Sequence, residues 1–423
     1  MIFDCLFDDD EKGKGDKETS GCICDCGRVV CCAQHTGKSL ARSNMRIEKS
    51  RPPSYLSAHF DESASRLQHQ CFFLTPRWFA LYWQEWAEKN YLGQATININ
   101  DNDYFVLLSR GRQRSRLGLS YESVGFNEAT EPLVQNLTVE FNGFLSAQDQ
   151  QSFTDGQPVT TPTNFEGCFD EFLTGLVDTP GWDELRVSAI SDDFANAAIG
   201  IARGRGLIAT IFSERKTYSV DLDLIREKFN SEYLATRSSN TRAQLRKSRR
   251  SIEIALGPLV LEPANSLECA QLWLSELGTL HAKQWNESKA IQGFNNPRFV
   301  GFHRKALDQL WHEGKVQILR INAGNKNVAY LHYFVVEGRA YFNMSGINYE
   351  ERDAVQPGLI AHWLAIDYFM SNGLSVYDFM GGTYRYKESL CTTKSGQKHL
   401  LFRRRRWFFV LEDFLRRLKR KRA

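Results

Sequence analysis

The fold of the second half of this chain depends on residues 315–380, which read KVQILRINAGNKNVAYLHYFVVEGRAYFNMSGINYEERDAVQPGLIAHWLAIDYFMSNGLSVYDFM. Three apolar runs, 315–321, 327–336 and 339–345, are joined by the short connectors AGNK and EG, which predicts an antiparallel meander. A loop then leads into an apolar helix that begins at Pro357-Gly358, and LSVYDFM predicts one more strand. The expected order is strand, strand, strand, loop, helix, strand.

The start of that helix predicts an anion-binding position. The first N–H groups of a helix have no intrahelical partners, and the macrodipole is positive there. Pro357 has no N–H to lose, and Gly358 would let a phosphate approach the backbone. Because Pro-Gly also opens many helices that bind nothing, an ordinary helix start is the alternative.

Helices precede the meander. Ser238 and Ser239 can cap a helix, NTRAQLRKSRRSIEIAL, that carries Arg242, Arg246 and further bases without an acid before Arg250. This face is expected to hold an anionic ligand such as a nucleotide-linked sugar, or else to be a solvated surface. The next helix, from Leu267, places His281 on its apolar face and is followed by one over 297–312.

The first half predicts mixed α/β structure. A helix begins at Thr75-Pro76, followed by strands at 94–99 and 104–108 and a polar loop over 147–164. The remaining expected elements are a helix (165–177), a strand (185–190), a helix (192–203) and two strands (207–213 and 217–221).

Composition agrees with a globular protein of two domains. The 423 residues are 42% apolar and 24% charged, with a net charge of +3. We predict a disordered leader (1–70), two α/β domains (71–235 and 236–402) and a basic tail (403–423). The acidic start does not have the order of a signal peptide, and no apolar run reaches the length of a membrane span. A cytoplasmic location is expected, with a peripheral position at the inner membrane surface as a further prediction.

The two ends of the chain are unusual. Six of the ten cysteines lie in the first 32 residues. The run CICDCGRVVCC is interpreted as part of the leader rather than as a metal site, because no second CxxC pair follows at zinc-finger distance. Residues 403–422 hold ten bases and two acids, with Trp407, Leu411, Phe414 and Leu418 on one helical stripe. Docking of this amphipathic helix on the protein core is favoured over contact with an anionic membrane, and no nucleic-acid motif is present.

The second half resembles the CelD/BcsL-type acetyltransferases, relatives of the GNAT acyltransferases and of the Fem peptidoglycan aminoacyltransferases. The resemblance is carried by SSNTRAQLRKSRR (238–250), His281-x-x-x-Trp285, PRFVGFHRKAL, Gln356-Pro357-Gly358 and Tyr377-Asp378-Phe379-x-Gly381, with Tyr384 and Lys387 after them. The resemblance covers about residues 235–392, and a weaker resemblance covers 72–235. It implies two tandem GNAT-like domains, in which the strand after the helix diverges from the meander to open an acyl slot. The usual pyrophosphate loop Q/R-x-x-G-x-G/A is absent, and only Gly358 stands in its place.

The resemblance implies transfer of an acetyl or other acyl group from acyl-CoA, a co-substrate, to an amine or hydroxyl of a sugar or cell-envelope polysaccharide precursor. His281 or Asp378 would be the base and Tyr384 an acid for the leaving thiolate. Gln356, Gly358 and Lys387 would hold the CoA, and Arg242, Arg246 and Trp285 the acceptor. Core packing of His281, a structural ion pair of Asp378 with Lys387 or a helix arginine, and an ordinary loop at Tyr384 are the alternatives. Two rival functions are an aminoacyltransferase that uses aminoacyl-tRNA and a binding subunit without activity. No metal is predicted.

Overall fold

The fold is described from a computed structural model of the chain, which describes residues 45–48, 71–74, 78, 79, 81, 82, 91–99, 102–130, 140–146, 165–285, 293–349, 356–382 and 384–420. The predicted leader lies almost wholly outside the described residues, as do its cysteine-rich run and the loop over 147–164. Residues 78, 79, 81 and 82 are helical, as expected for the helix after Pro76.

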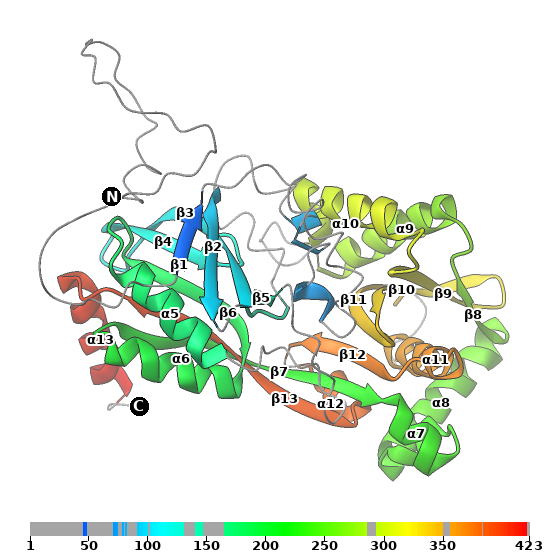
Figure 1. Cartoon of the computed structure of the whole chain (residues 1–423). Helices are drawn as coiled ribbons and strands as arrows, with labels where there is room; N and C mark the ends of the chain where they lie inside the picture. Colours follow the sequence, from blue (N-terminus) through cyan, green and yellow to red (C-terminus); the bar gives the residue numbers. More distant parts are fainter. Residues whose placement is uncertain are drawn as a thin grey trace, which may run out of the picture.

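The described part of the first half forms strands, helices and two short 3₁₀ segments, in agreement with the expected mixed α/β class (Figure 1). Its elements are β1 (Met45–Glu48), η1 (Phe72–Leu74), β2 (Tyr91–Ile99), β3 (Asn102–Arg114), β4 (Ser120–Phe126), β5 (Leu145–Ser146), α5 (Phe165–Val177), β6 (Glu184–Ser191), α6 (Asp192–Gly204), β7 (Ile208–Asp221), α7 (Leu222–Phe229) and η2 (Tyr233–Thr236).

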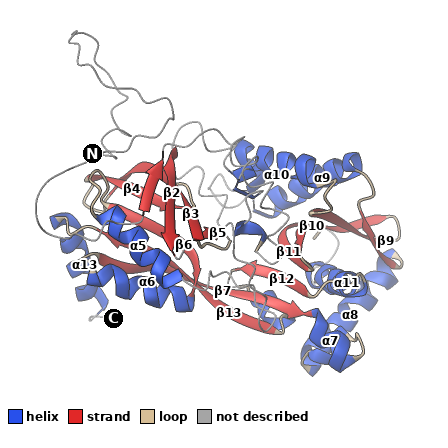
Figure 2. Ribbon diagram, viewed as in Figure 1, coloured by secondary structure: helices blue, strands red, loops and turns tan. Residues whose placement is uncertain are grey.

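The second half contains the predicted meander, helix and strand in the predicted order (Figure 2). Its elements are α8 (Ser239–Leu256), β8 (Leu259–Pro263), α9 (Leu267–Trp285), η3 (Gly293–Asn295), α10 (Pro297–Leu310), β9 (Val316–Ala323), β10 (Lys326–Val336), β11 (Arg339–Ile347), α11 (Pro357–Ser371), β12 (Val376–Gly381), α12 (Arg385–Leu390), β13 (Thr393–Arg403) and α13 (Trp407–Arg420).

The two halves repeat one arrangement. In the first, β2, β3 and β4 form an antiparallel meander, and β6 pairs parallel to β4 after α5. In the second, β9, β10 and β11 form the meander, and β12 pairs parallel to β11 after α11. The expected α/β class with two similar units is therefore confirmed, whereas the domain bounds 71–235 and 236–402 stay a prediction.

A single mixed sheet joins the two repeated arrangements, here called the first unit (β2 to β6) and the second unit (β8 to β12). Its order is β1-β2-β3-β4-β6-β13-β7-β12-β11-β10-β9-β8, with β5 paired to β3. Strand β7 follows the first unit in sequence but pairs with β12 of the second unit, whereas β13 follows the second unit and pairs with β6 of the first. The units thus exchange their last strands.

The prediction of two strands at 207–213 and 217–221 is wrong. Residues 208–221 form one strand, β7, whose pairing with β13 runs from Ile208↔Arg403 to Ser219↔Thr393. The intervening residues Ser213–Lys216 are polar, but they pair with β13, and this pairing overrides the local preference.

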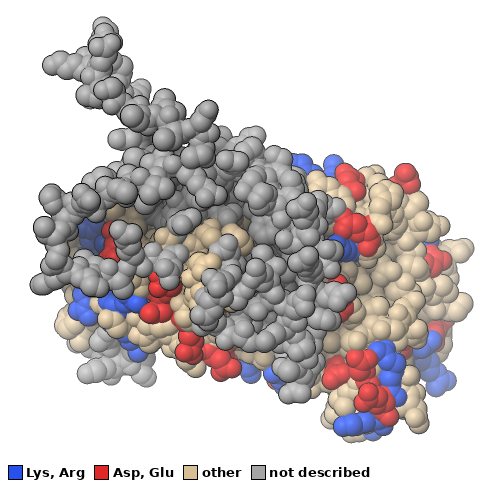
Figure 3. Space-filling view, in the orientation of Figure 1, with Lys and Arg blue, Asp and Glu red and all other residues tan. Residues whose placement is uncertain are grey.

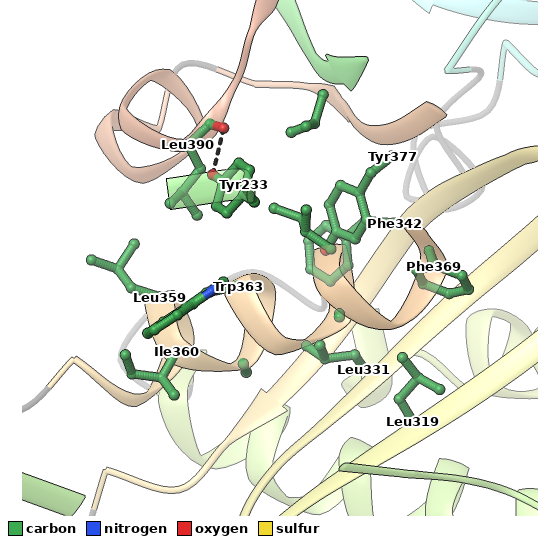
Figure 4. Close-up of a cluster of buried hydrophobic side chains, with 14 of the residues drawn as sticks. Tyr233, Leu319, Leu331, Phe342, Leu359, Ile360, Trp363, Phe369, Tyr377 and Leu390 are labelled. Atoms are coloured by element: carbon green, nitrogen blue, oxygen red, sulfur yellow. Dashed lines mark hydrogen bonds between the residues drawn. The ribbon is translucent and has the colours of Figure 1, made fainter. Parts of the chain in front are cut away.

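Two apolar cores lie on opposite faces of the second unit. One core packs α8 and α11 against the sheet, and Figure 4 shows part of it, including Trp363, Phe342 and Tyr377. The other core packs α9, α10 and residues 71–74, 78, 79, 81 and 82 against the opposite face. A third core fills the first unit beneath α5 and α6.

Helix α9 lies very close to β11 at Gly346. A Cβ added there would come within 2.6 Å of the Leu277 carbonyl oxygen and 3.0 Å of the Leu280 Cβ, both of α9. Because backbone cannot yield as a flexible side chain can, we expect Gly346→Ala to lower the free energy of unfolding by about 1–3 kcal/mol. Urea denaturation measures it. Gly200→Ala in α6, where nothing lies within 4 Å of the added Cβ, is the control and is expected to leave stability unchanged or to raise it. Equal stability of the two variants would contradict the close packing.

The basic helix α13 docks on the first unit, as the sequence favoured, but through residues outside the predicted stripe. Phe408 and Phe409 are buried against Tyr121 of β4. Trp407, Leu411, Phe414 and Leu418 are exposed. The stripe was assumed to face the core because it is apolar, but the contact falls on another side of the helix. Within the described residues, no helix is long and apolar enough to span a membrane.

Candidate active site

Strands β11 and β12 diverge. Their parallel pairing covers only Arg339–Tyr341 against Val376–Asp378. Beyond these residues β11 continues to Ile347 and β12 to Gly381, and no pairing joins them. The register of β10 with β11 also shifts between His332 and Tyr333, where Asn343 is the extra residue of a bulge. The second unit therefore has the open strand edge that its resemblance implied.

Two backbone amides of β11 face this open edge. The amide of Asn348 donates to the Val328 carbonyl of β10 over 3.0 Å, so Asn348 faces β10. Backbone groups of successive residues point alternately to the two edges of an antiparallel strand. The N–H groups of Ser345 and Ile347 consequently face away from β10, toward the gap that β12 leaves.

His281 lies beside the same edge. Its Nδ1 is 3.0 Å from the Ser345 carbonyl oxygen. A carbonyl oxygen only accepts, so Nδ1 carries the proton, and Nε2 carries the lone pair of the neutral ring. Burial lowers the pKa of His281, while the hydrogen bond to Ser345 opposes the shift. The ring is thus held in the neutral form and in one tautomer, next to the diverging strands.

The start of α11 places two predicted residues next to the basic helix. Gln356 is the N-cap residue, and its Oε1 accepts from Gln244 Nε2 of α8 over 2.8 Å. Gly358 follows in the first turn, where, among the described residues, an added Cβ would meet only the Tyr349 hydroxyl at 3.7 Å and Ile347 at 3.9 Å. Neither packing nor backbone conformation therefore requires a glycine at this position.

A surface hollow adjoins the same helix start. Its lining includes Ser251, Lys326, Asn348 and Pro357. Asn327 also lines it, and both polar atoms of its side-chain amide are buried without a hydrogen-bond partner. A buried amide without partners is costly, so this hollow has polar groups to offer a ligand.

The two predicted arginines of α8 differ in their surroundings. Arg242 is half-buried and donates from Nη1 to the Arg237 carbonyl over 2.6 Å, whereas Arg246 is exposed. Figure 3 shows acidic as well as basic side chains over the lower right, where α7 and α8 lie. Trp285 ends α9, and its side chain lies outside the described part of the chain.

Asp378 forms a buried ion pair. Its Oδ2 accepts from Arg339 Nη1 over 2.8 Å, and its Oδ1 accepts from the Met380 amide over 2.7 Å. The two side chains are 4% and 2% exposed. The sequence suggested Lys387 or an arginine of the basic helix as a structural partner, but the partner is Arg339, the first residue of β11.

Lys387 and Tyr384 lie at the end of β12. The Lys387 ammonium is buried and donates to the Phe379 and Gly381 carbonyls over 2.7 and 2.6 Å. Burial lowers the pKa of Lys387 to about 8. The Tyr384 ring is half-exposed and lies 5.6 Å from this ammonium. Phosphate binding by Lys387 would have to compete with two carbonyls that already hold its charge.

The sequence analysis missed a buried series of hydrogen bonds between the sheet and α11. The Tyr333 hydroxyl is 2.8 Å from the Tyr377 hydroxyl, which is 2.6 Å from His362 Nδ1 of α11. The His362 ring stacks on Tyr386 of α12, and burial lowers the pKa of His362 to about 3. A histidine in an otherwise apolar helix was the available signal in the sequence, which did not indicate the partners of His362.

The matching gap of the first unit is filled by the chain itself. Pairing of β4 with β6 stops after Gly125↔Arg186. Beyond it, the Glu128 carboxylate accepts from the Ser188 amide over 2.9 Å, and the Asn142 amide donates to the Ala189 carbonyl over 3.1 Å. Burial raises the pKa of Glu128 to about 7. The backbone groups of β6 that face this gap are therefore satisfied internally.

Comparisons with known proteins agree with this arrangement. Residues 239–388 match the acetyltransferase (GNAT) domain. No curated protein matches the chain. A crystal structure of FemX is 9% identical with a TM-score of 0.50, covering 81% of this chain and 95% of its own. L-PGS from Bacillus licheniformis is 12% identical, with a TM-score of 0.46, and the alignment covers 88% of this chain and 98% of that one. A tandem GNAT protein from the clavulanic acid biosynthesis pathway is 10% identical, with a TM-score of 0.39, over 85% of this chain and 97% of its own.

The likeness to FemX extends over both units and shows a shared fold. The second unit is similar to a GNAT acetyltransferase domain over residues 239–388 and has a GNAT acyltransferase fold. The finer resemblance to the CelD/BcsL type stays a prediction.

Proposed function

We propose that this chain transfers an acetyl or other acyl group from acyl-CoA to an amine or hydroxyl of a sugar or cell-envelope precursor. The observation that carries the proposal is the unpaired edge of β11 beyond Tyr341, opposite the end of β12. A thioester with an extended pantetheine arm can add to such an edge by backbone hydrogen bonds, as a peptide strand does.

The amides of Ser345 and Ile347 are the groups that would hold the donor. Preorganised N–H groups aimed at the oxygen of the reacting carbonyl stabilise the negative charge that develops there during attack. They would cost no reorganisation, because β10 fixes the other edge of β11 along its length.

His281 is the proposed base. It would take a proton at Nε2 from the acceptor amine or hydroxyl as that group attacks the acyl carbon. The new bond to nitrogen or oxygen forms, the carbon–sulfur bond breaks, and the thiolate leaves with the electron pair. Tyr384, half-exposed at the start of α12, is the proposed donor of a proton to this thiolate. Asp378, whose oxygens are held by Arg339 and Met380, is assigned a structural role in this proposal.

The phosphates of the donor would lie at the start of α11. The helix dipole, Gln356 and the open backbone of Gly358 favour an anion there. The bases of α8 lie close, since Gln244 of α8 contacts Gln356. Arg246, exposed on α8, is proposed as a phosphate or acceptor contact, and the half-buried Arg242 as a weaker one.

Calorimetry with acetyl-CoA tests the proposal. We expect one molecule bound per chain, because Glu128 and Asn142 already close the gap of the first unit. Gly358→Glu places a carboxylate where the phosphates would lie and should weaken binding at least tenfold. Gly358→Ala is the matched control: it fits sterically and adds no charge, so it should weaken binding less than Gly358→Glu does.

Calorimetry with aminoacyl-tRNA, run beside that with acetyl-CoA, separates the alternatives. Binding of aminoacyl-tRNA without any binding of acetyl-CoA would replace the proposed donor. Binding of neither donor would favour a subunit without activity. A stoichiometry of two acetyl-CoA molecules would show that the first unit opens its gap.

A further inference from the structure

Two elements far apart in the sequence expose apolar side chains at one end of the molecule. In α13 the exposed apolar residues are 39–66% accessible, and they are Trp407, Val410, Leu411, Phe414, Leu415 and Leu418. The tip of the β3–β4 hairpin adds Leu117 and Leu119, which are 44% and 36% accessible. The two elements touch, because the Arg116 amide donates to Glu412 Oε1 of α13 over 2.7 Å.

The exposed side of α13 is separate from its docking side. At 100° per residue, Trp407, Phe414 and Leu418 fall within about 40° of one another. Phe408, Phe409 and Glu412, which are buried against the first unit, lie on the other side of the helix. The protein thus uses one face of α13 for docking and leaves a second apolar face to the solvent.

This end of the molecule is also strongly basic. Residues 403–422 carry ten bases and two acids, and Arg403 to Arg406 among these bases contact groups of the first half of the chain. The hairpin contributes Arg112, Arg114 and Arg116, all exposed. Apolar residues flanked by this many cations are typical of segments that lie in the interface of an anionic lipid bilayer.

We propose that α13 and the 115–119 hairpin tip form a surface, here called the basic–apolar end, that binds an anionic membrane in plane. The apolar side chains enter the boundary between headgroups and acyl chains, and the bases of the hairpin and of residues 416–422 contact lipid phosphates. A second copy of the chain is a poorer occupant, since a symmetric contact would bring two such basic segments together. This inference does not depend on the acyl-transfer reaction.

Flotation of the full chain with vesicles tests the proposal. We expect binding to vesicles of equal parts phosphatidylcholine and phosphatidylglycerol, loss of binding in high salt, and little binding to phosphatidylcholine alone. Phe414→Glu, at a site 57% exposed, should weaken partitioning by roughly tenfold or more. Leu117→Glu tests the hairpin independently and should also weaken it.

Leu272→Glu is the matched control. Leu272 is 58% exposed on α9, at the opposite end of the molecule from α13 (Figure 1), so its replacement should leave flotation unchanged. Circular dichroism checks that each variant is folded. Absence of flotation with anionic vesicles would overturn the proposal, as would flotation that Phe414→Glu leaves intact. Self-association without lipid that Phe414→Glu abolishes would assign the surface to a second copy instead.

Discussion

Replacement of Asp378 by alanine is expected to lower the free energy of unfolding by about 3–5 kcal/mol. The Arg339 guanidinium is 2% exposed, and Asp378 is its carboxylate partner at 2.8 Å. Removal of the carboxylate would leave a positive charge in the core and would also take the acceptor from the Met380 amide. Urea denaturation measures the loss, and the double variant Asp378→Ala/Arg339→Leu should recover part of it.

The control for this prediction is a pair at the surface. Arg205 and Asp170 are 2.7 Å apart but 29% and 51% exposed, so Asp170→Ala should cost less than about 1 kcal/mol. An Asp378→Ala variant of wild-type stability that has lost its activity would contradict the structural role. The carboxylate would then act on the acceptor, as the sequence also allowed.

Replacement of His281 by glutamine is expected to lower kcat/KM by about 10²–10⁴-fold, the usual contribution of a general base. Glutamine can still donate to the Ser345 carbonyl, so the contact between α9 and β11 is kept. In the wild type, the acid limb of the pH profile should lie below pH 6.5, because burial lowers the pKa of His281 and only the neutral ring accepts a proton. In the variant this limb should disappear.

His312→Gln is the matched control. His312 is exposed just beyond α10, and its replacement should change neither the rate nor the pH profile. If His281→Gln kept the acid limb and lost only binding, His281 would be a positioning residue and the base would lie elsewhere.

The elements with strong local periodicity were predictable. The meander, α11 and β12 follow from apolar runs with short connectors, and the structure places them within a few residues of the expected bounds. Strands β4 and β13 were missed, since their sequences mix polar and apolar residues and depend on pairing with β3, β6 and β7. Such strands are defined by their neighbours more than by their own residues.

The site was predictable only in part. His281 was identified by its position on an apolar helix face, but its tautomer follows from Ser345, which is 64 residues away. Asp378 was recognised as a carboxylate in need of a partner, yet the sequence could not show that Arg339 stands beside it across the strand pair. Lys387 was expected to help bind the CoA, and the structure shows that its ammonium donates to two carbonyls of β12. Contacts across the sheet are a property of register, which composition does not reveal.

The exchange of β7 and β13 between the units has a consequence for any attempt to divide this protein. A cut between α7 and α8 would give two fragments, and each would carry a strand whose partners are on the other. Neither fragment could complete its sheet alone, so each would expose a long unpaired edge prone to aggregation. Produced in the same cell, the two fragments should instead reassemble, which makes this chain a natural candidate for a split reporter.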